Sequence, residues 1–417
     1  PFLERLAATA PDRFKVTFRV ARGHISEATN SAAALATGDF LLFLDQDDEL
    51  APEALSEAAL HLASNPETDV LYSDSDKIDA AGRRSDPHFK PDWSPELLLV
   101  YMYAGQVQCI RRSLFESLGG LRKGFEGAQD HDLALRAGPL ARRVGHIPKI
   151  LYHWRVMPGS TALGGGEKQY SFEAARRAVQ EALQRMNSPG VAIRPPWAIR
   201  NGNALFYHEF PDDGPAVTII IPVRNRPELL ERCLTSLAMT TYTAYSVVVA
   251  DDESDDPAVA EISARHGHRH LRVPRAGAKF SFARLNNRAV AACDTEFVLF
   301  LNNDTEIIDP RWLTRMMGYA RMPGVGTVGA LLTYPDGRIQ HAGIIHAMRN
   351  GLADHAFKLL PEGNLGYMCY AGIVRNCSAV TAACLVTPRA LFQRLGGFDE
   401  AAFPVAFNDP DYCFRAG

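Results

Sequence analysis

Apolar runs that end abruptly in acids or amides are the main pattern along this chain. One run, FLLFL at 40–44, is followed by Asp45, and another, FVLFL at 297–301, is followed by Asn302. A short uninterrupted apolar run is typical of a buried parallel strand. Polar groups at the carboxyl end of such a strand commonly line the ligand crevice of an α/β protein. The pattern therefore predicts two buried strands, each with a candidate site at its end.

The two runs belong to a longer internal repeat. Residues 40–50 and 297–307 share six of eleven residues at an offset of 257. SLFESLGG (113–120) matches ALFQRLGG (390–397) at five of eight positions, and QDHDLALRAG (129–138) matches NDPDYCFRAG (408–417) at five of ten. The order is kept while the offset grows slowly, which indicates duplicated domains.

The repeat predicts the domain organisation. We expect a first domain over 1–187, a proline-rich linker over 188–215 and a second domain over 216–417. At the same offsets, the partner of the strand at Val217 would precede Pro1, and the partner of LYHWR (151–155) would follow Gly417. We therefore expect both domains to be truncated.

The second domain alternates strands with helices. It has predicted strands at 217–223, 246–256, 271–273 and 297–301 and helices at 226–237 and 281–292. This order predicts an α/β fold with a parallel sheet. In the first domain we expect strands at 15–20, 40–45 and 70–73, helices at 52–63 and 169–187, and an ordered loop at 79–96.

Composition excludes several classes of protein. The 417 residues are 47% hydrophobic and 22% charged, which is ordinary for a globular chain and argues against disorder. A net charge of −4 gives no electrostatic case for nucleic acid. Seven scattered cysteines lack the paired spacing of zinc sites, so free thiols in a reducing compartment are expected.

Acids and amides at the strand ends carry the candidate chemistry. Asp251 and Asp252 could accept hydrogen bonds from the base or ribose of a nucleotide, or they could cap a helix. Asp45 and Asp47 are separated by one residue, as carboxylates that share a divalent cation often are, with Asp304 as the main acid of the second copy. The alternative for these acids is a solvated turn.

Two further acids and a histidine complete the candidates. Asp130 and Asp409 follow a Gly-Gly turn by 10 and 12 residues and start a helical run, so each could accept a proton from an attacking hydroxyl or cap the helix. Their neighbours Asp132 and Asp411 suit a structural role at a helix start. His153 could be a metal ligand or a packed residue beside Trp154.

With these residues in place, the chain resembles family 2 glycosyltransferases of the GT-A fold. It is most similar to the tandem bacterial enzymes that build O-antigen and related surface polysaccharides, rhamnosyltransferase-like members included. The motifs are FLDQDDEL, YSDSDKID, HFKPDWSPELL, QDHDLALR and YHWR in the first domain. In the second they are IIIPVRNRPELLERCLTSL, VVVADDESDD, FLNNDTEI, YPDGRIQHAGI and GGFDEAAFPVAFNDPDYCFR.

The resemblance implies two GT-A domains in tandem and a role for each candidate residue. Asp130 and Asp409 would be catalytic bases, and Asp45, Asp47, Asp304 and His153 would bind Mn²⁺ or Mg²⁺. Nucleotide contacts would come from Pro222, Arg224, Asp251, Asp252, Asn287 and Asn303.

The implied reaction is an inverting transfer from a UDP-, dTDP- or GDP-sugar to a glycan or lipid-linked glycan. It would take place in the cytoplasm and allows peripheral association with the inner face of the plasma membrane.

Two alternatives stay open from the sequence. Asn302 replaces a carboxylate in the second metal motif, which favours a non-catalytic glycan-binding or scaffold module for that domain. A nucleotidyltransferase that forms sugar nucleotides would carry a glycine-rich basic loop after its first strand, and PVRNRPE (222–228) has no glycine.

Overall fold

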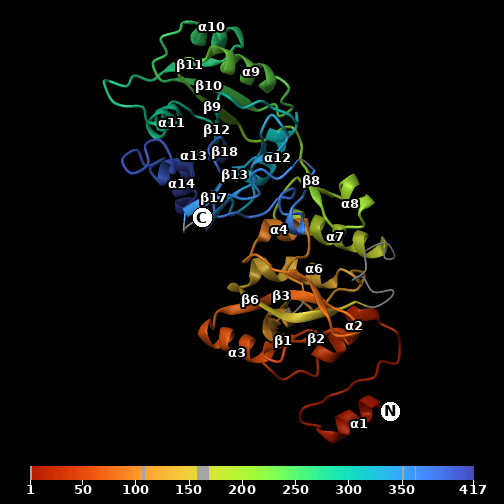
Figure 1. Ribbon diagram of the computed structural model, residues 1–417. Coiled ribbons are helices and arrows are strands. Elements are labelled where there is room, and N and C mark those ends of the chain that lie inside the picture. Colours follow the sequence, from red (N-terminus) through yellow and green to blue (C-terminus); the bar gives the residue numbers. More distant parts are fainter. Residues whose placement is uncertain (1, 106–108, 157–168, 350–351, 362) are drawn as a thin grey trace. The chain divides into compact units, whose positions relative to one another are not determined.

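The computed structural model describes residues 2–105, 109–156, 169–349, 352–361 and 363–417. The chain forms two compact units (Figure 1). Unit 1 comprises Pro1–Arg185, Val191–Tyr207 and Val374–Asn376, and unit 2 comprises Met186–Gly190, His208–Ile373 and Cys377–Gly417. The segment predicted to be a linker contains regular structure instead: β7 (Val191–Ile193), α8 (Pro196–Arg200) and β8 (Tyr207–Glu209).

Unit 2 is built on a sheet of order β11-β10-β9-β12-β18-β13. The first four of these strands are parallel, and β18 is antiparallel to both of its neighbours. The strands are β9 (Val217–Val223), β10 (Tyr245–Asp251), β11 (Arg269–Arg272), β12 (Phe297–Leu301), β13 (Val328–Gly329) and β18 (Cys384–Pro388). The short strands β14 (Leu332–Thr333) and β15 (Ile339–His341) form one pair, and β16 (Ile344–Arg349) and β17 (Leu352–His355) form another.

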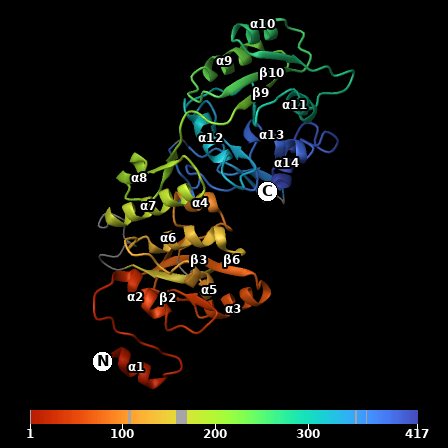
Figure 2. The same cartoon turned by 180° about the vertical axis from the view of Figure 1, so that it is seen from behind.

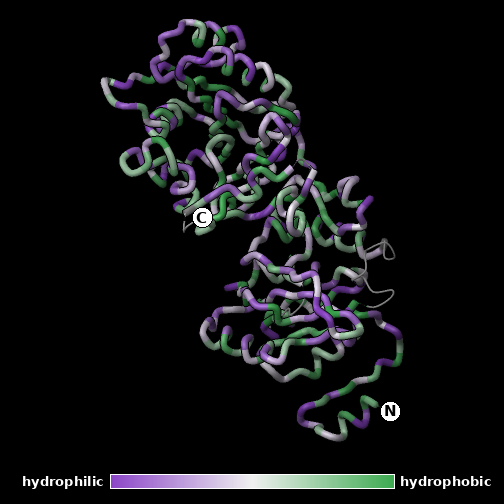
Figure 3. Tube along the Cα trace, viewed as in Figure 1, coloured by the Kyte–Doolittle hydropathy of each residue, from purple (hydrophilic) through white to green (hydrophobic). Residues whose placement is uncertain are grey.

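Helices cover both faces of the unit 2 sheet (Figures 1 and 2). Ile219 and Ile221 of β9 pack with α9, α10 and α12 on one face, and Ile220 packs with α11, α13 and α14 on the other. The central strands carry the hydrophobic colour in Figure 3, as expected for strands buried on both faces. The helices are α9 (Pro227–Leu237), α10 (Ala258–Arg265), α11 (Phe282–Ala291), α12 (Trp312–Ala320), α13 (Arg389–Arg394) and α14 (Asn408–Ala416).

Unit 1 contains a sheet of order β1-β5-β3-β6-β2, with β4 on the edge of β3. The strands are β1 (Phe40–Leu42), β2 (Glu49–Leu50), β3 (Thr68–Ile78), β4 (Arg84–His88), β5 (Cys109–Arg111) and β6 (Arg143–Arg155). The helices are α1 (Phe2–Thr9), α2 (His24–Ala33), α3 (Ala54–Ser64), α4 (Pro95–Val100), α5 (Arg112–Ser117), α6 (Gln129–Ala137) and α7 (Gln169–Arg185).

The repeat is visible in the strand register. Phe40 of β1 pairs antiparallel with Arg111 of β5, and Phe297 of β12 pairs antiparallel with Pro388 of β18. These are the offsets of 257 and 277 found in the sequence. The strand pair and the two helices that follow it therefore form the same structural unit in both copies.

An asparagine holds the Gly-Gly turn in each copy. Asn287 Nδ2 donates to the Phe398 carbonyl at 2.9 Å, and Phe398 N donates back to Asn287 Oδ1 at 3.0 Å. In unit 1, Asn30 makes the same pair of bonds with Leu121, at 2.8 and 2.9 Å. A Cβ on Gly397 would lie 2.5 Å from Asn287 Oδ1, and φ there is +75°, so the turn requires glycine.

An aspartate and an arginine hold the same turn from the following helix. In unit 2, Arg415 donates to the carbonyls of Leu395 and Gly397 at 2.7 and 2.8 Å, and its Nη2 is 2.6 Å from Asp411 Oδ2. In unit 1 Arg136 makes the same contacts with Leu118, Gly120 and Asp132, at 2.9 to 3.0 Å. The second acid of each Asp-x-Asp therefore has a structural role, as predicted, but it acts by pairing with an arginine rather than by capping the helix.

Two predicted elements of unit 1 were wrong. Residues 15–20 form no strand despite their alternation, because a strand needs a hydrogen-bonded neighbour and β1 pairs only with β5 in the described sheet. The segment 79–96, predicted to be a loop, contains β4, which pairs with an unexpectedly long β3. Pro87 is tolerated there because β4 is an edge strand.

All seven cysteines are free thiols. Within the described ranges no helix combines the length and the apolar character needed to cross a bilayer.

Burial should set the strength of the two aspartate–arginine contacts. The Asp132 side chain is 1% exposed between Arg122 and Arg136, whereas that of Asp411 is 22% exposed. We expect Asp132→Asn to lower the free energy of unfolding by about 3 kcal/mol, as for a broken buried pair. Asp411→Asn should cost about 1 kcal/mol. Urea unfolding followed by tryptophan fluorescence measures both, and equal losses would contradict this ranking.

Candidate functional site

The carboxyl ends of three parallel strands bring most of the predicted nucleotide residues of unit 2 to one edge. β9 is hydrogen-bonded to β10 on one side and to β12 on the other. Pro222 lies in β9 and Arg224 follows it, while Asn303 and Asp304 follow β12. Arg224 and Asp304 are exposed, and Pro222 and Asn303 are half-buried. This edge is where α/β sheets of this kind bind ligands.

Asp251, the last residue of β10, is buried and fully engaged. Its Oδ1 accepts from Ser254 N at 2.8 Å, and its Oδ2 lies 3.1 Å from His270 Nε2 and 3.6 Å from Arg272 Nη1. Only 1% of the residue is exposed. A nucleotide hydroxyl or N–H group that bonds to this carboxylate would take the place of one of the basic partners.

Asp252 has no exposed surface and forms an ion pair with Arg275. Arg284 Nη2 is 3.8 Å from the second carboxylate oxygen, Oδ1, which accepts no hydrogen bond. A buried carboxylate oxygen that accepts no hydrogen bond is uncommon, and it lowers the stability of the fold. Asp252 therefore holds two arginines at the edge of the sheet.

The structure corrects the prediction for Asn287. Its Nδ2 donates to the Phe398 carbonyl and to Glu400 Oε1, both at 2.9 Å, and its Oδ1 accepts from Phe398 N. Both donors and one acceptor position of the amide are thus used within the fold. Asn287 is a structural residue of the Gly-Gly turn rather than a nucleotide ligand.

Three consecutive residues before β18 bring Asp409 to the same edge. Ala383 O accepts from Asn302 N at 3.0 Å, and Ala382 N donates to Asp409 Oδ2 at 3.1 Å. Thr381 N donates to His341 Nε2 at 3.4 Å. The segment 381–383 therefore joins the end of β12, the start of α14 and a buried histidine.

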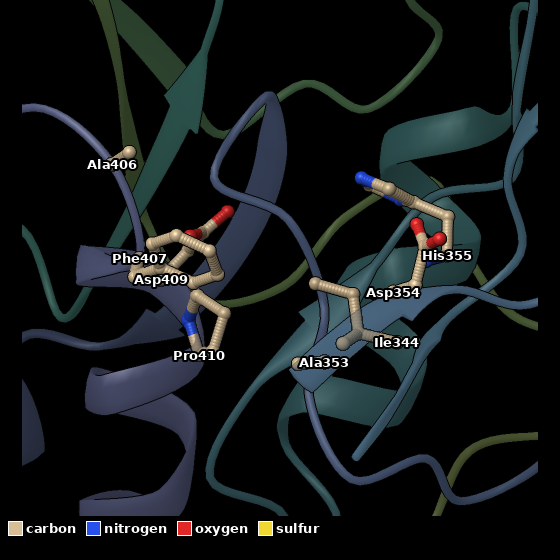
Figure 4. A pocket seen from close by; sticks show the side chains of 8 residues that line it. All are labelled: Ile344, Ala353, Asp354, His355, Ala406, Phe407, Asp409 and Pro410. Atoms are coloured by element: carbon tan, nitrogen blue, oxygen red, sulfur yellow. The ribbon is translucent and has the colours of Figure 1, made fainter. Parts of the chain in front are cut away.

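Asp409 lines a cavity of about 180 Å³ (Figure 4). Its carboxyl group and the ring of Phe407 form one wall, and Asp354 and His355 of β17 form the facing wall. The half-buried Asp409 thus combines a position fixed by the Ala382 peptide with access to a cavity. This geometry suits a group that must reach a substrate hydroxyl.

Carboxylates crowd the corresponding place in unit 1. The protein atoms that displace water from one side of Asp45 raise the pKa of its carboxyl group, and Asp48, Asp130 and Asp47 raise it further. Asp130, at the start of α6, is therefore near enough to Asp45 to interact with it. Asp48 accepts hydrogen bonds from Tyr152 Oη and Arg155 N, which tie it to β6.

The structure does not bring His153 together with Asp45 and Asp47 as predicted. His153 lies on β6 opposite Glu49, and its Nδ1 is 2.6 Å from Asp76 Oδ1. Among the residues described, no three His, Cys, Asp or Glu side chains gather as a ready metal site. His153 is a buried residue paired with Asp76. Of the two roles considered for it, a packed residue therefore fits the structure better than a metal ligand.

Sequence reasoning missed the basic partners of the acids and the histidines near Asp409. Arg275 and Arg284 come from a loop and a helix more than 20 residues after Asp252. His341 lies in YPDGRIQHAGI, which carried part of the family resemblance but no chemical role. A cluster of basic residues after the third strand, in RVPRAGAKF (272–280), was the available signal.

The chain matches known proteins over its whole length. The sequence profile of Glycosyl transferase family 2 matches residues 2–119 and 218–379. The protein y4gI of Sinorhizobium fredii is 41% identical over 99% of this chain and 45% of its own length. The O-antigen biosynthesis protein RfbC of Myxococcus xanthus is 37% identical over 100% of this chain and 32% of its own length. The chain thus spans less than half of these relatives.

Solved structures show more distant likeness. The mannosyltransferase PcManGT of Pyrobaculum calidifontis, solved with GDP-Man and Mn²⁺, is 20% identical, covers 48% of this chain and 50% of its own, and has a TM-score of 0.34. TarS of S. aureus (residues 1–349), in complex with UDP-GlcNAc, is also 20% identical, covers 44% of this chain and 54% of its own, and has a TM-score of 0.35.

The profile matches part of each copy of the repeat, and each copy has the mixed α/β sheet expected of a GT-A domain. The predicted fold class and the predicted family resemblance are therefore confirmed, and the chain belongs to glycosyl transferase family 2.

Proposed function

We propose that unit 2 transfers a sugar from a nucleoside-diphosphate donor to a hydroxyl group of a glycan or lipid-linked glycan, with inversion. The acceptor oxygen bonds to the anomeric carbon, the bond from that carbon to the diphosphate oxygen breaks, and Asp409 takes the hydroxyl proton. The single observation that carries the proposal is the position of Asp409. It lines a cavity and is tied through Ala382 and Ala383 to the end of β12.

The nucleotide would bind at the edge formed by β9, β10 and β12. Asp251 and Asp252 offer acceptors for base or ribose groups, and Arg275 and Arg284 offer positive charge for the diphosphate. Because Arg275 pairs with Asp252 before any ligand arrives, donor binding would exchange one charged contact for another. Pro222, Arg224 and Asn303 would line the same edge.

A divalent cation fits the carboxylates of unit 1 better than those of unit 2. Mg²⁺ and Mn²⁺ take oxygen ligands and commonly use one or two carboxylates together with substrate phosphates. Asp45 and Asp47, with a raised pKa at Asp45, match such a partial shell. In unit 2 the exposed Asp304 would be the main carboxylate. A cation held there would neutralise charge on the departing nucleoside diphosphate.

Asp130 would be the base of unit 1, and the same transfer chemistry would apply there. The relative named for O-antigen biosynthesis supports a surface polysaccharide as the product, and a rhamnosyl donor is one case. We place the reaction in the cytoplasm, at the inner face of the plasma membrane if the acceptor is lipid-linked.

One observation favours a second function for unit 2. Asn302 and Asn303 occupy positions where unit 1 has Asp45 and Gln46, which leaves Asp304 without a second carboxylate. A domain that binds glycan without catalysis would tolerate that loss, whereas a metal-dependent transferase would be weakened by it. Activity of Asp409 variants decides between the two functions.

We expect one of UDP, dTDP or GDP to bind this chain more tightly with Mn²⁺ than without it, because the diphosphate completes the partial cation shell. Asp251→Asn keeps the size of the side chain but removes its charge, and should weaken binding by about 10-fold. Isothermal titration calorimetry measures each affinity.

Asn287→Ala is the matched control. It should lower thermal stability by loosening the Gly-Gly turn and leave nucleotide affinity unchanged. If a folded chain binds none of the three nucleotides, the proposed function is wrong. If Asn287→Ala weakens nucleotide binding as much as Asp251→Asn does, the structural role assigned to Asn287 is wrong.

We expect Asp409→Asn to reduce sugar transfer by roughly 10²-fold or more, because the amide cannot accept the proton. Nucleotide affinity should stay as it is, because the proposed nucleotide site is the strand edge and not the cavity that Asp409 lines. Initial rates with radiolabelled sugar nucleotides, measured beside calorimetric affinities, test both statements.

Asp411→Asn provides the control from the same Asp-x-Asp motif. It should leave the rate per folded molecule unchanged while lowering stability. The assignment of the two acids is reversed if Asp411→Asn abolishes transfer in a folded protein and Asp409→Asn does not.

A further inference from the structure

The cavity beside Asp409 has three kinds of group on its walls (Figure 4). The carboxylates of Asp409 and Asp354 are acceptors, the imidazole of His355 is polar, and Phe407 adds an aromatic ring. The volume of about 180 Å³ is well below the roughly 300–1,000 Å³ of sites for drug-sized ligands. A small cavity with polar walls and one aromatic group suits a single sugar ring.

Hydrogen bonds fix the proton positions on the two histidines. His341 is 1% exposed, and its Nε2 accepts from Gly343 N at 3.3 Å and from Thr381 N at 3.4 Å. Since Nε2 accepts, the ring proton of His341 is on Nδ1. Nδ1 lies 2.8 Å from His355 Nδ1 and donates to it.

The contact with His341 determines what His355 presents to the cavity. Because His355 Nδ1 accepts, its own proton is on Nε2, and the ring is neutral. Burial lowers the pKa of His355, and Lys358 lowers it further, against the opposing effect of Asp354 and Asp409. His355 is therefore a fixed N–H donor on the wall that faces Asp409.

Phe407 is positioned at a conformational cost. Its φ of 62° is in the left-handed region, which is uncommon for a residue other than glycine, asparagine or aspartate. The residue is 51% exposed although its side chain is large and apolar. Strain of this kind clusters at functional sites, and an exposed aromatic ring beside a polar cavity is a surface on which a sugar ring can pack.

We propose that this cavity is the acceptor-sugar subsite of unit 2. His355 Nε2–H donates to the oxygen of the acceptor hydroxyl, Asp409 accepts the hydrogen of that hydroxyl, and Phe407 packs against the apolar face of the sugar ring. His355 is thus a specificity and positioning residue, because it selects for a ring whose hydroxyl reaches both walls. The inference rests on the proposed function, in which Asp409 is the base.

The test compares two reactions of the whole chain with the same donor. Hydrolysis uses water as acceptor and needs no sugar subsite, whereas transfer to methyl α-L-rhamnoside, methyl α-D-mannoside or methyl β-D-galactoside does. We expect His355→Ala to raise the KM for the accepted methyl glycoside by about 10-fold, the effect of one lost hydrogen bond. Hydrolysis of the sugar nucleotide should stay within about twofold.

Three further variants sharpen the comparison. His355→Gln restores an N–H donor and should recover part of the affinity for the acceptor. Phe407→Asn keeps a residue that tolerates the left-handed conformation while removing the ring, and should also raise the acceptor KM. His346→Ala, on the neighbouring strand β16 and outside the cavity, should change neither reaction.

A direct measurement separates this inference from the proposed function. In protein labelled with ¹⁵N-histidine, the His355 signals should show the Nε2–H tautomer and should move when a methyl glycoside is added without donor. Signals that no glycoside moves, an Nδ1–H tautomer, or equal losses of transfer and hydrolysis in folded His355→Ala would each overturn the inference. Failure of every sugar nucleotide to bind or react would instead reject the proposed function, while the titration still decides whether the cavity binds sugar.

Discussion

The candidate site of unit 2 depends on three consecutive peptide groups, those of Thr381, Ala382 and Ala383. They hydrogen-bond to His341, to Asp409 and to Asn302 respectively. Backbone groups hold their partners in place without the rotamer freedom of long side chains, so the distances between the three partners vary little. Since β18 follows directly and is held between β12 and β13, this segment is anchored to the core of unit 2.

The second constraint is the Gly-Gly turn, which holds the helix that begins with the Asp-x-Asp motif. In both units an asparagine holds the turn from one side, and an arginine paired with the second Asp of Asp-x-Asp holds it from the other. The arginine therefore occupies the second acid of the motif in both units, and in unit 2 the first acid, Asp409, lines the cavity. Spacing alone could not show these arginine contacts, and the position of Asp132 and Asp411 in the first turn of the helix indicated only a structural role.

Much of the fold was accessible from the sequence because buried parallel strands have a strong apolar signature, as in β9, β10 and β12. Residues 15–20 and β4 were mispredicted because pairing with a neighbouring strand, not local pattern, decides whether a segment is a strand. The acids at the strand ends could be found in the sequence because each follows directly after one of these apolar runs. The sequence did not reveal Arg275 and His355, because only tertiary contacts bring these residues close to the acids.

The two units differ in how charge is balanced around equivalent backbone positions. In unit 1, Lys90 Nζ donates to the carbonyl of Gly105, and a Cβ on Gly105 would lie 3.6 Å from Asp130 Oδ2. Burial lowers the pKa of Lys90 to about 7, so this basic group changes charge near neutrality beside crowded carboxylates. In unit 2 the segment before β18 instead meets His341, and the positions of Asp45 and Asp48 are taken by Asn302 and Thr305. The fold thus places Asp130 near several carboxylates in unit 1, whereas Asp409 of unit 2 shares its cavity with one carboxylate, that of Asp354, and with His355. Two such settings would favour donors or acceptors of different charge, which gives a physical reason for one chain to carry the domain twice.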